Sequence, residues 1–201
     1  MNFNLMGETF PTTVNGPGQR YLIHLQFCPL ACPGCFNPES WSPKIKELID
    51  VEILADRIIK KSPDGLSISG GEPFAQSKSL LHFLKYLYKD GNPFPKGILI
   101  FSGYTRAELK DIPEFEEILQ YIDVIISGRF EIKNRVYSSM LSSSNQEFIF
   151  SGRGLITQEE LENQDFEVII EEDGLKLTGF PEINKENIKY LKQLGVEIKV
   201  K

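Results

Sequence analysis

The sequence is poor in cysteine and histidine and has no long apolar run. Its 201 residues include three cysteines and two histidines. An odd number of cysteines cannot all pair within the chain, so we expect no framework of disulfides. No apolar stretch approaches the roughly 18 residues of a membrane-spanning helix. The N-terminus lacks the basic region and apolar core of a signal peptide, and we therefore expect a cytoplasmic protein without a membrane partner.

Clustered positive charge is also missing. The chain has 22 Lys and Arg against 28 Asp and Glu, which gives a formal net charge of −6 at pH 7. A dedicated nucleic-acid surface shows clustered Lys and Arg, so no nucleic-acid partner is expected. There is no internal repeat and no Ser/Gly-rich linker. The length suits one domain, and we expect residues 1–201 to form it.

The cysteines that are present lie within eight consecutive positions, in the segment Cys28-Pro-Leu-Ala-Cys32-Pro-Gly-Cys35. Cysteine thiolates bind zinc or iron–sulfur clusters. A structural zinc site takes four protein ligands, commonly as two distant pairs, whereas this chain offers one group of three. His24, in the strand before this segment, and His82, on a predicted helix, are expected to be ordinary histidines rather than ligands.

The spacing instead predicts a [4Fe–4S] cluster with three irons bound by Cys28, Cys32 and Cys35. The fourth iron would then be open to a group that is not protein, which is typical of a catalytic cluster. In the alternative interpretation the cysteines are small apolar core residues. Two prolines and a glycine among them argue against a strand or a helix here, and therefore against that alternative.

Short apolar strands alternate with amphipathic helices from residue 20 onwards. Strands are predicted at 20–27, 66–69, 97–101, 123–127 and 148–150, and helices at 51–61, at 77–89 and within 106–121. Residues 1–19 are predicted to be irregular, and the four prolines of residues 29–43 predict a loop. The order of the first seven elements, βαβαβαβ, predicts a parallel sheet covered by helices.

The pattern is looser after about residue 135. The dipeptide Asp173-Gly174 predicts a β-hairpin between residues 166–171 and 175–178. A last helix at about 184–194 and a strand at 196–200 are predicted to follow. We therefore expect a mixed C-terminal part, and its strand partners stay open.

Cys-x3-Cys-x2-Cys in a loop after a first strand resembles the signature of the radical S-adenosylmethionine (SAM) superfamily. A second match is Gly70-Gly71-Glu72-Pro73, directly after the second predicted strand. By this resemblance, Gly70, Gly71 and Glu72 bind the methionine amino group of SAM. Glycines let backbone carbonyls approach an ammonium closely, and the Glu72 carboxylate can add a negative charge.

Within that superfamily the chain resembles the activating proteins of anaerobic (class III) ribonucleotide reductases, a family that includes organic radical activating enzymes. Pyruvate formate-lyase activating enzyme is a more distant relative. The resemblance covers most of residues 10–150 and rests on these segments: NGPGQR (15–20), LQFC (25–28), CPGCFNPESW (32–41), FSGY (101–104), IDVIISGRF (122–130) and SSNQ (143–146).

The resemblance implies a fold and further contacts to SAM. The fold is α/β, a partial (β/α)6 TIM-like barrel with its active site at the carboxyl ends of the strands, a core at about 15–130 and a variable, mixed part at about 131–201. Further candidate contacts stand beside the cluster and at the ends of strands: Phe36 against adenine, then Ser102, Gly103, Tyr104, Ser127 and Asn145. For Phe36 and Tyr104 a purely structural role is the alternative.

The chain departs from this family at a few positions. Gly34 precedes the third cysteine where the superfamily often has an aromatic residue, although the ribonucleotide reductase activators also have glycine there. Ser127 stands where those activators usually have Asp, and Leu141-Ser142 where they have Arg-Gly. About fifty residues follow Gln146, more than in the most compact members. These differences bear on the substrate more than on the chemistry.

The implied activity is that of a radical SAM oxidoreductase. A reduced cluster passes one electron to SAM, which gives methionine and a 5′-deoxyadenosyl radical, and that radical takes hydrogen from a glycine Cα of a partner such as an anaerobic ribonucleotide reductase. Flavodoxin or ferredoxin is the implied reductant. Two alternatives stay open: a radical SAM enzyme acting on a small molecule or peptide, and a non-catalytic metal-cluster scaffold. No cysteine follows Cys35, which argues against auxiliary clusters.

Overall fold

The computed structural model describes residues 1–137, 139–162, 165–171 and 174–180. Its strands are β1 (Asn2–Thr12), β2 (Arg20–Leu25), β3 (Glu47–Asp50), β4 (Gly65–Gly70), β5 (Ile98–Ser102), β6 (Val124–Ser127), β7 (Glu147–Phe150), β8 (Phe166–Glu171) and β9 (Gly174–Gly179). Its α-helices are α1 (Val51–Lys60), α2 (Ser77–Leu87), α3 (Arg106–Lys110) and α4 (Phe115–Ile118). Single 3₁₀ turns occur at Pro38–Trp41, Pro73–Gln76, Ile132–Asn134 and Glu159–Leu161.

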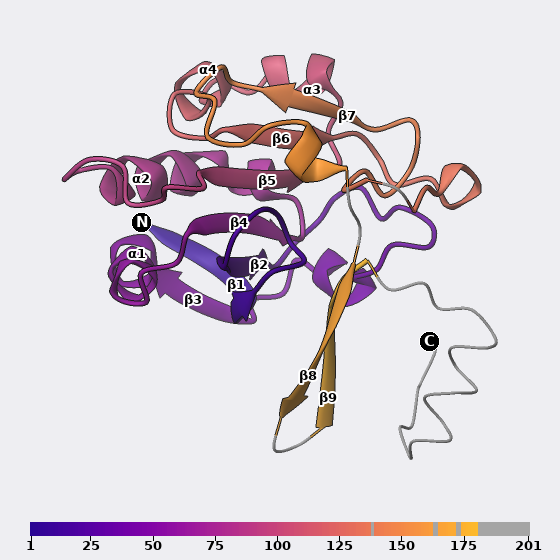
Figure 1. Ribbon diagram of the computed structural model, residues 1–201, viewed down its shortest axis with the longest axis horizontal. Helices are drawn as coiled ribbons and strands as arrows, with labels where there is room; N and C mark the ends of the chain where they lie inside the picture. Colours follow the sequence, from indigo (N-terminus) through magenta and orange to yellow (C-terminus); the bar gives the residue numbers. More distant parts are fainter. Residues whose placement is uncertain (138, 163–164, 172–173, 181–201) are drawn as a thin grey trace.

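A seven-stranded sheet in the order β3-β1-β2-β4-β5-β6-β7 carries the fold (Figure 1). Its centre, β2-β4-β5-β6, is parallel, as predicted. β1 runs antiparallel to both of its neighbours, and β7 runs antiparallel to β6. The architecture is therefore mixed α/β. Over the described residues the sheet is open, with β3 and β7 at its edges, and no closed barrel is formed.

The strands β5 and β6 are buried on both faces, which explains why their sequences are almost continuously apolar. Ile98 and Ile100 of β5 face the larger core, where α1, α2 and α4 also pack. Leu99 lies between them in sequence and faces a smaller core with Met140 and Ile156. This alternation follows from the two-residue period of a strand.

The prediction that residues 1–19 are irregular is wrong, because β1 occupies residues 2–12. Asn2, Asn4, Gly7 and Pro11 lower the strand propensity of this segment and hide its pattern. Backbone pairing with β2 on one side and β3 on the other stabilises the strand although its local propensity is low. The four-residue strand β3 was not predicted either, and it exists as the edge partner of β1.

The helix predictions are largely confirmed. α1 begins at Val51, and the side chain of Asp50 accepts a hydrogen bond from the Glu52 N–H at 2.9 Å, as expected of a capping residue. The helical material predicted within 106–121 is divided into α3 and α4. Pro113 lies in the break, since proline disfavours helical backbone in the residue before it and has no N–H to donate.

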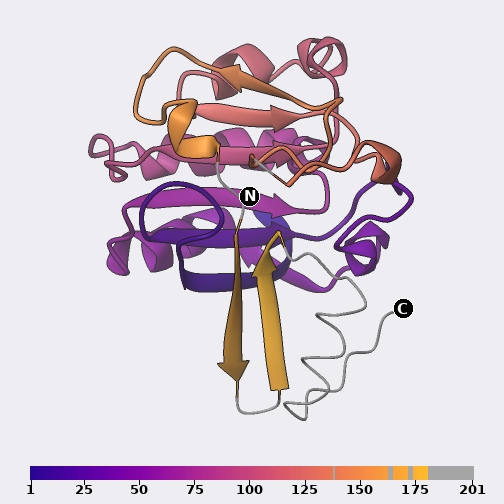
Figure 2. The same ribbon diagram turned by 45° about the vertical axis from the view of Figure 1, so that its right-hand side comes forward.

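The predicted hairpin is confirmed as the antiparallel pair β8–β9, a separate two-stranded sheet. Figures 1 and 2 show that it projects away from the large sheet. The predicted helix at 184–194 and strand at 196–200 lie outside the described residues. None of the helices in the described ranges is both long and apolar enough to span a bilayer.

A fully buried arginine ties the starts of the parallel strands together. The Arg20 guanidinium donates hydrogen bonds to Ser67 Oγ at 2.6 Å and to four backbone carbonyls, those of Pro17, Leu66, Lys96 and Gly97. A Cβ on Gly65 would collide with this guanidinium. Each of the five acceptors would lose one hydrogen bond if Arg20 were removed, and unsatisfied buried polar groups are costly.

We predict that Arg20→Lys lowers the free energy of unfolding by about 3–5 kcal/mol, because a lysine ammonium cannot reach five acceptors arranged around a planar guanidinium. Urea denaturation followed by circular dichroism measures the change. The matched control is Arg57→Lys, whose ion pair with Glu8 is partly exposed and whose loss is expected to cost less than about 1 kcal/mol. Equal effects of the two changes would contradict the role assigned to Arg20.

Candidate active site

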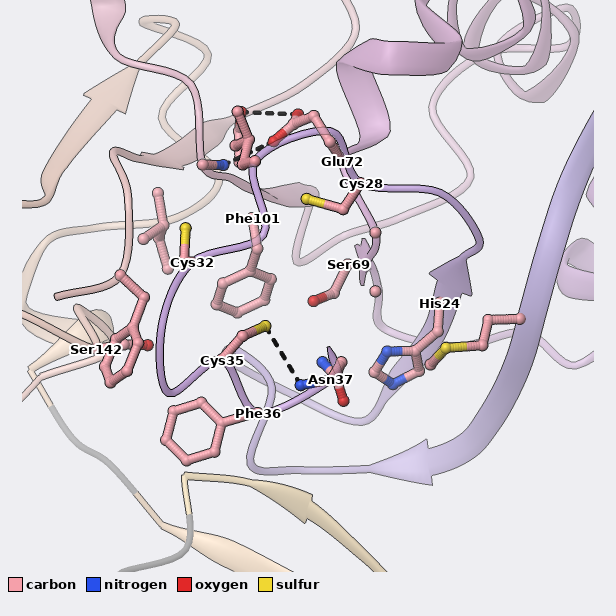
Figure 3. A pocket seen from close by; sticks show the side chains of 18 of the residues that line it. His24, Cys28, Cys32, Cys35, Phe36, Asn37, Ser69, Glu72, Phe101 and Ser142 are labelled. Atoms are coloured by element: carbon pink, nitrogen blue, oxygen red, sulfur yellow. Dashed lines mark hydrogen bonds between the residues drawn. The ribbon is translucent and has the colours of Figure 1, made fainter. Parts of the chain in front are cut away.

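A cavity of about 640 Å³ lies at the carboxyl ends of the parallel strands. Each of these strands contributes the residues that follow it: Cys28 after β2, Gly71 after β4, Gly103 after β5 and Gly128 after β6. Parallel strands present their carboxyl ends at one edge of a sheet, and open α/β sheets bind ligands there. The three cysteines all line this cavity, and Figure 3 shows their side chains around the same space.

The cysteine loop is held in place at both of its ends. Phe27 has a φ of 83°, and its N–H donates to the Ser40 carbonyl at 2.8 Å. The side-chain amide of Gln26 donates to the carbonyls of Glu39 at 3.1 Å and of Ser42 at 2.9 Å. These bonds join the start of the loop to its end, so the cysteines between them project from a closed loop.

The three thiols are free and partly exposed. Burial raises the pKa of the Cys28 and Cys32 thiols above the usual value, while the Asn37 N–H donates to Cys35 Sγ at 3.4 Å. Within the described ranges, no three His, Cys, Asp or Glu side chains are arranged to hold a single metal ion. In a [4Fe–4S] cluster each thiolate binds a different iron, so the three sulfurs need not converge on one point.

The glycine turn packs directly on the start of the cysteine loop. Gly71 N–H donates to the Leu25 carbonyl at 2.6 Å, and Glu72 N–H donates to the Phe27 carbonyl at 2.9 Å. Gly70 has a φ of 97°, which favours glycine, and a Cβ there would lie 2.5 Å from the Leu25 nitrogen. A Cβ on Gly71 would collide with the Phe27 carbonyl. The glycines are therefore required for backbone contact between the two motifs.

Glu72 is buried, with 1% of its surface exposed, and it connects the glycine turn to the end of β5. Its carboxylate accepts hydrogen bonds from Ser102 Oγ at 2.9 Å and from Gly103 N–H at 2.7 Å (Figure 3), and a third from Phe74 N–H at 3.0 Å. Burial raises the pKa of Glu72 to about 7, and these hydrogen bonds oppose the rise. The predicted SAM contacts Glu72, Ser102 and Gly103 are thus brought together in one network.

The raised pKa of Glu72 makes stability depend on pH. Between the usual glutamate pKa of 4.5 and the native value of about 7, the folded state binds more protons than the unfolded state. The contribution of Glu72 is therefore fully present below pH 4.5 and is lost as the pH rises through about 7, with an upper bound on the order of 3 kcal/mol.

We predict that Glu72→Gln flattens this dependence for the protein without cluster, because glutamine does not titrate. Urea midpoints measured at pH 5 and pH 8 under reducing conditions test it. The exposed Glu116→Gln is the control and should keep the slope of the original chain. An unchanged slope in Glu72→Gln would show that other groups cause the dependence. Glutamine also places an N–H₂ against a donor, so a general loss of stability accompanies the flattening.

The remaining predicted residues divide into two groups. Phe36 lines the cavity with 38% of its surface exposed, and its ring lies 5.4 Å from that of Phe130. Tyr104, Ser127 and Asn145 do not line it. Ser127 Oγ donates to the Tyr104 carbonyl at 2.8 Å, so the structure uses this pair to join the ends of β5 and β6. Asn145 donates to the Arg129 carbonyl at 2.8 Å.

Arg129 brings positive charge to the cysteine side of the cavity. It donates to the Gly103 carbonyl at 3.1 Å and forms an ion pair with Glu108, which lowers the pKa of Glu108 to about 2. Its charge and the N–H of Phe130 both oppose the rise in the Cys32 pKa. The segment after β6 therefore offsets part of the rise that burial causes in the Cys32 pKa.

Several lining residues were not predicted: Met6, Leu30, Ser69, Phe101, Ile126, Gln146, Leu177, Thr178, Gly179 and Phe180. Gln146 belongs to a segment that carries the family resemblance, so that signal was available. Its side chain donates to the Gly128 carbonyl at 2.8 Å and accepts from the Ser142 N–H at 2.8 Å. The four hairpin residues 177–180 carried no local signal of a site.

These residues fit a [4Fe–4S] cluster by their donor chemistry. Three thiols face one cavity, and no fourth cysteine exists in the chain. The cavity extends past the cysteines to the glycine turn and the end of β5, where Gly70, Gly71 and Gly103 are among the lining residues. A cluster held by three cysteines would therefore adjoin free space for a second ligand.

Comparison with known proteins supports this assignment. A family described as a 4Fe-4S single cluster domain matches residues 14–149. The anaerobic ribonucleoside-triphosphate reductase-activating protein of Pasteurella multocida is 36% identical over 131 residues, which cover 62% of this chain and 82% of that protein. The pyruvate formate-lyase-activating enzyme of Staphylococcus epidermidis is 28% identical over 156 residues, covering 71% of this chain and 59% of that protein.

Among solved structures, QueE from Escherichia coli matches with a TM-score of 0.38 and 25% identity, covering 52% of this chain and 53% of that one. The family match includes all three cysteines, the glycine turn and every parallel strand of the sheet. The chain therefore belongs to the 4Fe-4S single cluster domain family, together with the anaerobic ribonucleoside-triphosphate reductase-activating proteins.

Proposed function

We propose that this protein is a radical SAM activating enzyme, which cleaves SAM reductively at a [4Fe–4S] cluster and generates a glycyl radical on a partner such as an anaerobic ribonucleoside-triphosphate reductase. One observation carries the proposal. Cys28, Cys32 and Cys35 line a single cavity that also reaches the glycine turn, in a chain whose relatives are named as activating proteins. When bound, the [4Fe–4S] cluster would supply the electron that reduces the sulfonium of SAM. The protein would position SAM and exclude water from the cavity.

The residues of the chain would act as follows. The three cysteines hold the cluster, and the backbone of Gly70 and Gly71 receives the amino group of SAM. Glu72 keeps the end of β5 in place, and its Oε2, which accepts one hydrogen bond, has capacity for a second donor such as an ammonium. Phe36, which lines the cavity, offers a ring face for adenine.

The proposal includes finer features implied by the family. The strands β2, β4, β5 and β6 with their helices would form the core, about residues 15–130, of a partial (β/α)6 barrel. The remainder would be a variable part of the same single domain. Tyr104 and Ser127, which shape the ends of β5 and β6, would act on SAM through that backbone. A flavodoxin or ferredoxin in the cytoplasm would supply the electron.

The test is reconstitution with iron and sulfide under argon, followed by SAM and dithionite. We expect a [4Fe–4S]⁺ signal in electron paramagnetic resonance, release of 5′-deoxyadenosine, and a glycyl doublet when the reductase of the same organism is added. Cys32→Ala should lower 5′-deoxyadenosine release at least 100-fold, since one iron loses its ligand. Ser79→Ala, at a half-buried α2 position that does not line the cavity, is the control and should leave it unchanged.

The outcomes separate the alternatives. Absence of a cluster, or of 5′-deoxyadenosine, contradicts the proposal and favours a scaffold. Release of 5′-deoxyadenosine without any glycyl doublet on the reductase contradicts the activating role and leaves a radical SAM enzyme with another substrate.

A further inference from the structure

The hairpin β8–β9 contributes a wall of the cavity, although it belongs to a sheet of its own. Leu177, Thr178 and Gly179 of β9 and the following Phe180 line the cavity beside the cysteine loop. The ring of Phe180 lies 6.2 Å from that of Phe101, another lining residue. This end of the hairpin is therefore part of the rim, while its strands project away from the large sheet (Figures 1 and 2).

One face of the hairpin is fixed to the body by polar contacts. Glu167 accepts hydrogen bonds from the Thr13 N–H at 2.8 Å and from Thr13 Oγ1 at 2.6 Å. Opposite Glu167 in the register, Thr178 is buried and accepts from the side-chain amide of Asn15 at 2.9 Å. Cross-strand partners lie on the same face of a sheet, so this face is the one that docks on residues 12–15.

The opposite face is apolar and exposed. Val168 pairs with Leu177 in the register, and Phe166 lies two residues before Val168 on the same side of β8. The exposed fractions of these side chains are 43% for Phe166, 42% for Val168 and 39% for Leu177. Leu177 also lines the cavity, so this apolar face, formed by Phe166, Val168 and Leu177, continues directly from the rim outward.

This continuity indicates which kind of substrate the face suits. A small molecule needs contacts inside the cavity only, and an apolar face outside it would contribute nothing to binding. A glycine of a protein belongs to a polypeptide, which must cross the rim on its way into the cavity and out again. An extended segment that follows a β-strand buries alternate side chains against just such a face.

We infer that the apolar face of the hairpin is the docking surface for the polypeptide segment of the partner enzyme that carries the target glycine. The inference rests on the proposed function and identifies the partner surface for it. The polar contacts of Glu167 and Thr178 set the orientation of the hairpin, and Leu177 connects the docking surface to the cavity where the cysteines lie.

The experiment measures binding separately from chemistry. The probe is the anaerobic ribonucleoside-triphosphate reductase of the same organism, immobilised for biolayer interferometry under argon with cluster-loaded protein and SAM. We expect the double change Phe166→Thr and Val168→Thr to raise the Kd at least tenfold. Neither residue lines the cavity, so 5′-deoxyadenosine release without reductase should stay as in the original chain.

The matched control is the double change Leu48→Thr and Phe150→Thr. These side chains are exposed by 54% and 40% on the edge strands β3 and β7, and the Kd should stay within twofold. The single change Val168→Thr keeps a β-branched side chain in the strand and should raise the Kd about threefold. Because this variant disturbs the strand less, it tests the surface even if the double variant misfolds.

A Kd within twofold of the original for both hairpin variants overturns the inference, as does a reductase that the original chain fails to bind. A separate result applies to the proposed function. If the hairpin variants weaken binding but the original chain releases no 5′-deoxyadenosine, the docking surface stands and the proposed chemistry fails.

Discussion

The architecture of the site depends on the close contact between the cysteine loop and the glycine turn. Two backbone hydrogen bonds, from Gly71 and Glu72 to the carbonyls of Leu25 and Phe27, join the segments that leave β2 and β4. Any side chain at Gly71 would push them apart. The cysteines of one motif and the backbone groups of the other therefore face the same cavity because two adjacent parallel strands end in register.

Further hydrogen bonds link this contact to the neighbouring strands of the sheet. Glu72 extends it to β5 through Ser102 and Gly103, and the pair Ser127 and Tyr104 extends it to β6. At the other end of the parallel strands, where they begin, Arg20 donates to the Leu66 carbonyl of β4 and to the carbonyls of Lys96 and Gly97, which come just before β5. The strands are thus held at both ends, which makes the wall that they form around the cavity rigid.

The sequence by itself determined the chemistry. Cysteine spacing is a local pattern, and it predicted the cluster. The family resemblance carried by the cysteines and the glycine turn implied a site at the carboxyl ends of the strands, where the cavity lies. The helices α1 and α2 could also be predicted from the sequence. The Asp50 cap of α1 and the 3.6-residue apolar period of both helices are signals that lie within a single helix. Proline and glycine in the cysteine loop excluded regular structure there. All of these signals come from neighbouring residues.

The tertiary structure alone decided which partners these elements meet. β1 is a strand because two neighbours pair with it, against its own weak propensity. Glu72 looked like a simple ligand in the sequence, but burial brings three donors to its carboxylate and raises its pKa to about 7. The hairpin was predictable as a hairpin, whereas its place at the cavity rests on contacts between Asn15 and Thr178. Such contacts join residues far apart in the chain, and no local pattern encodes them.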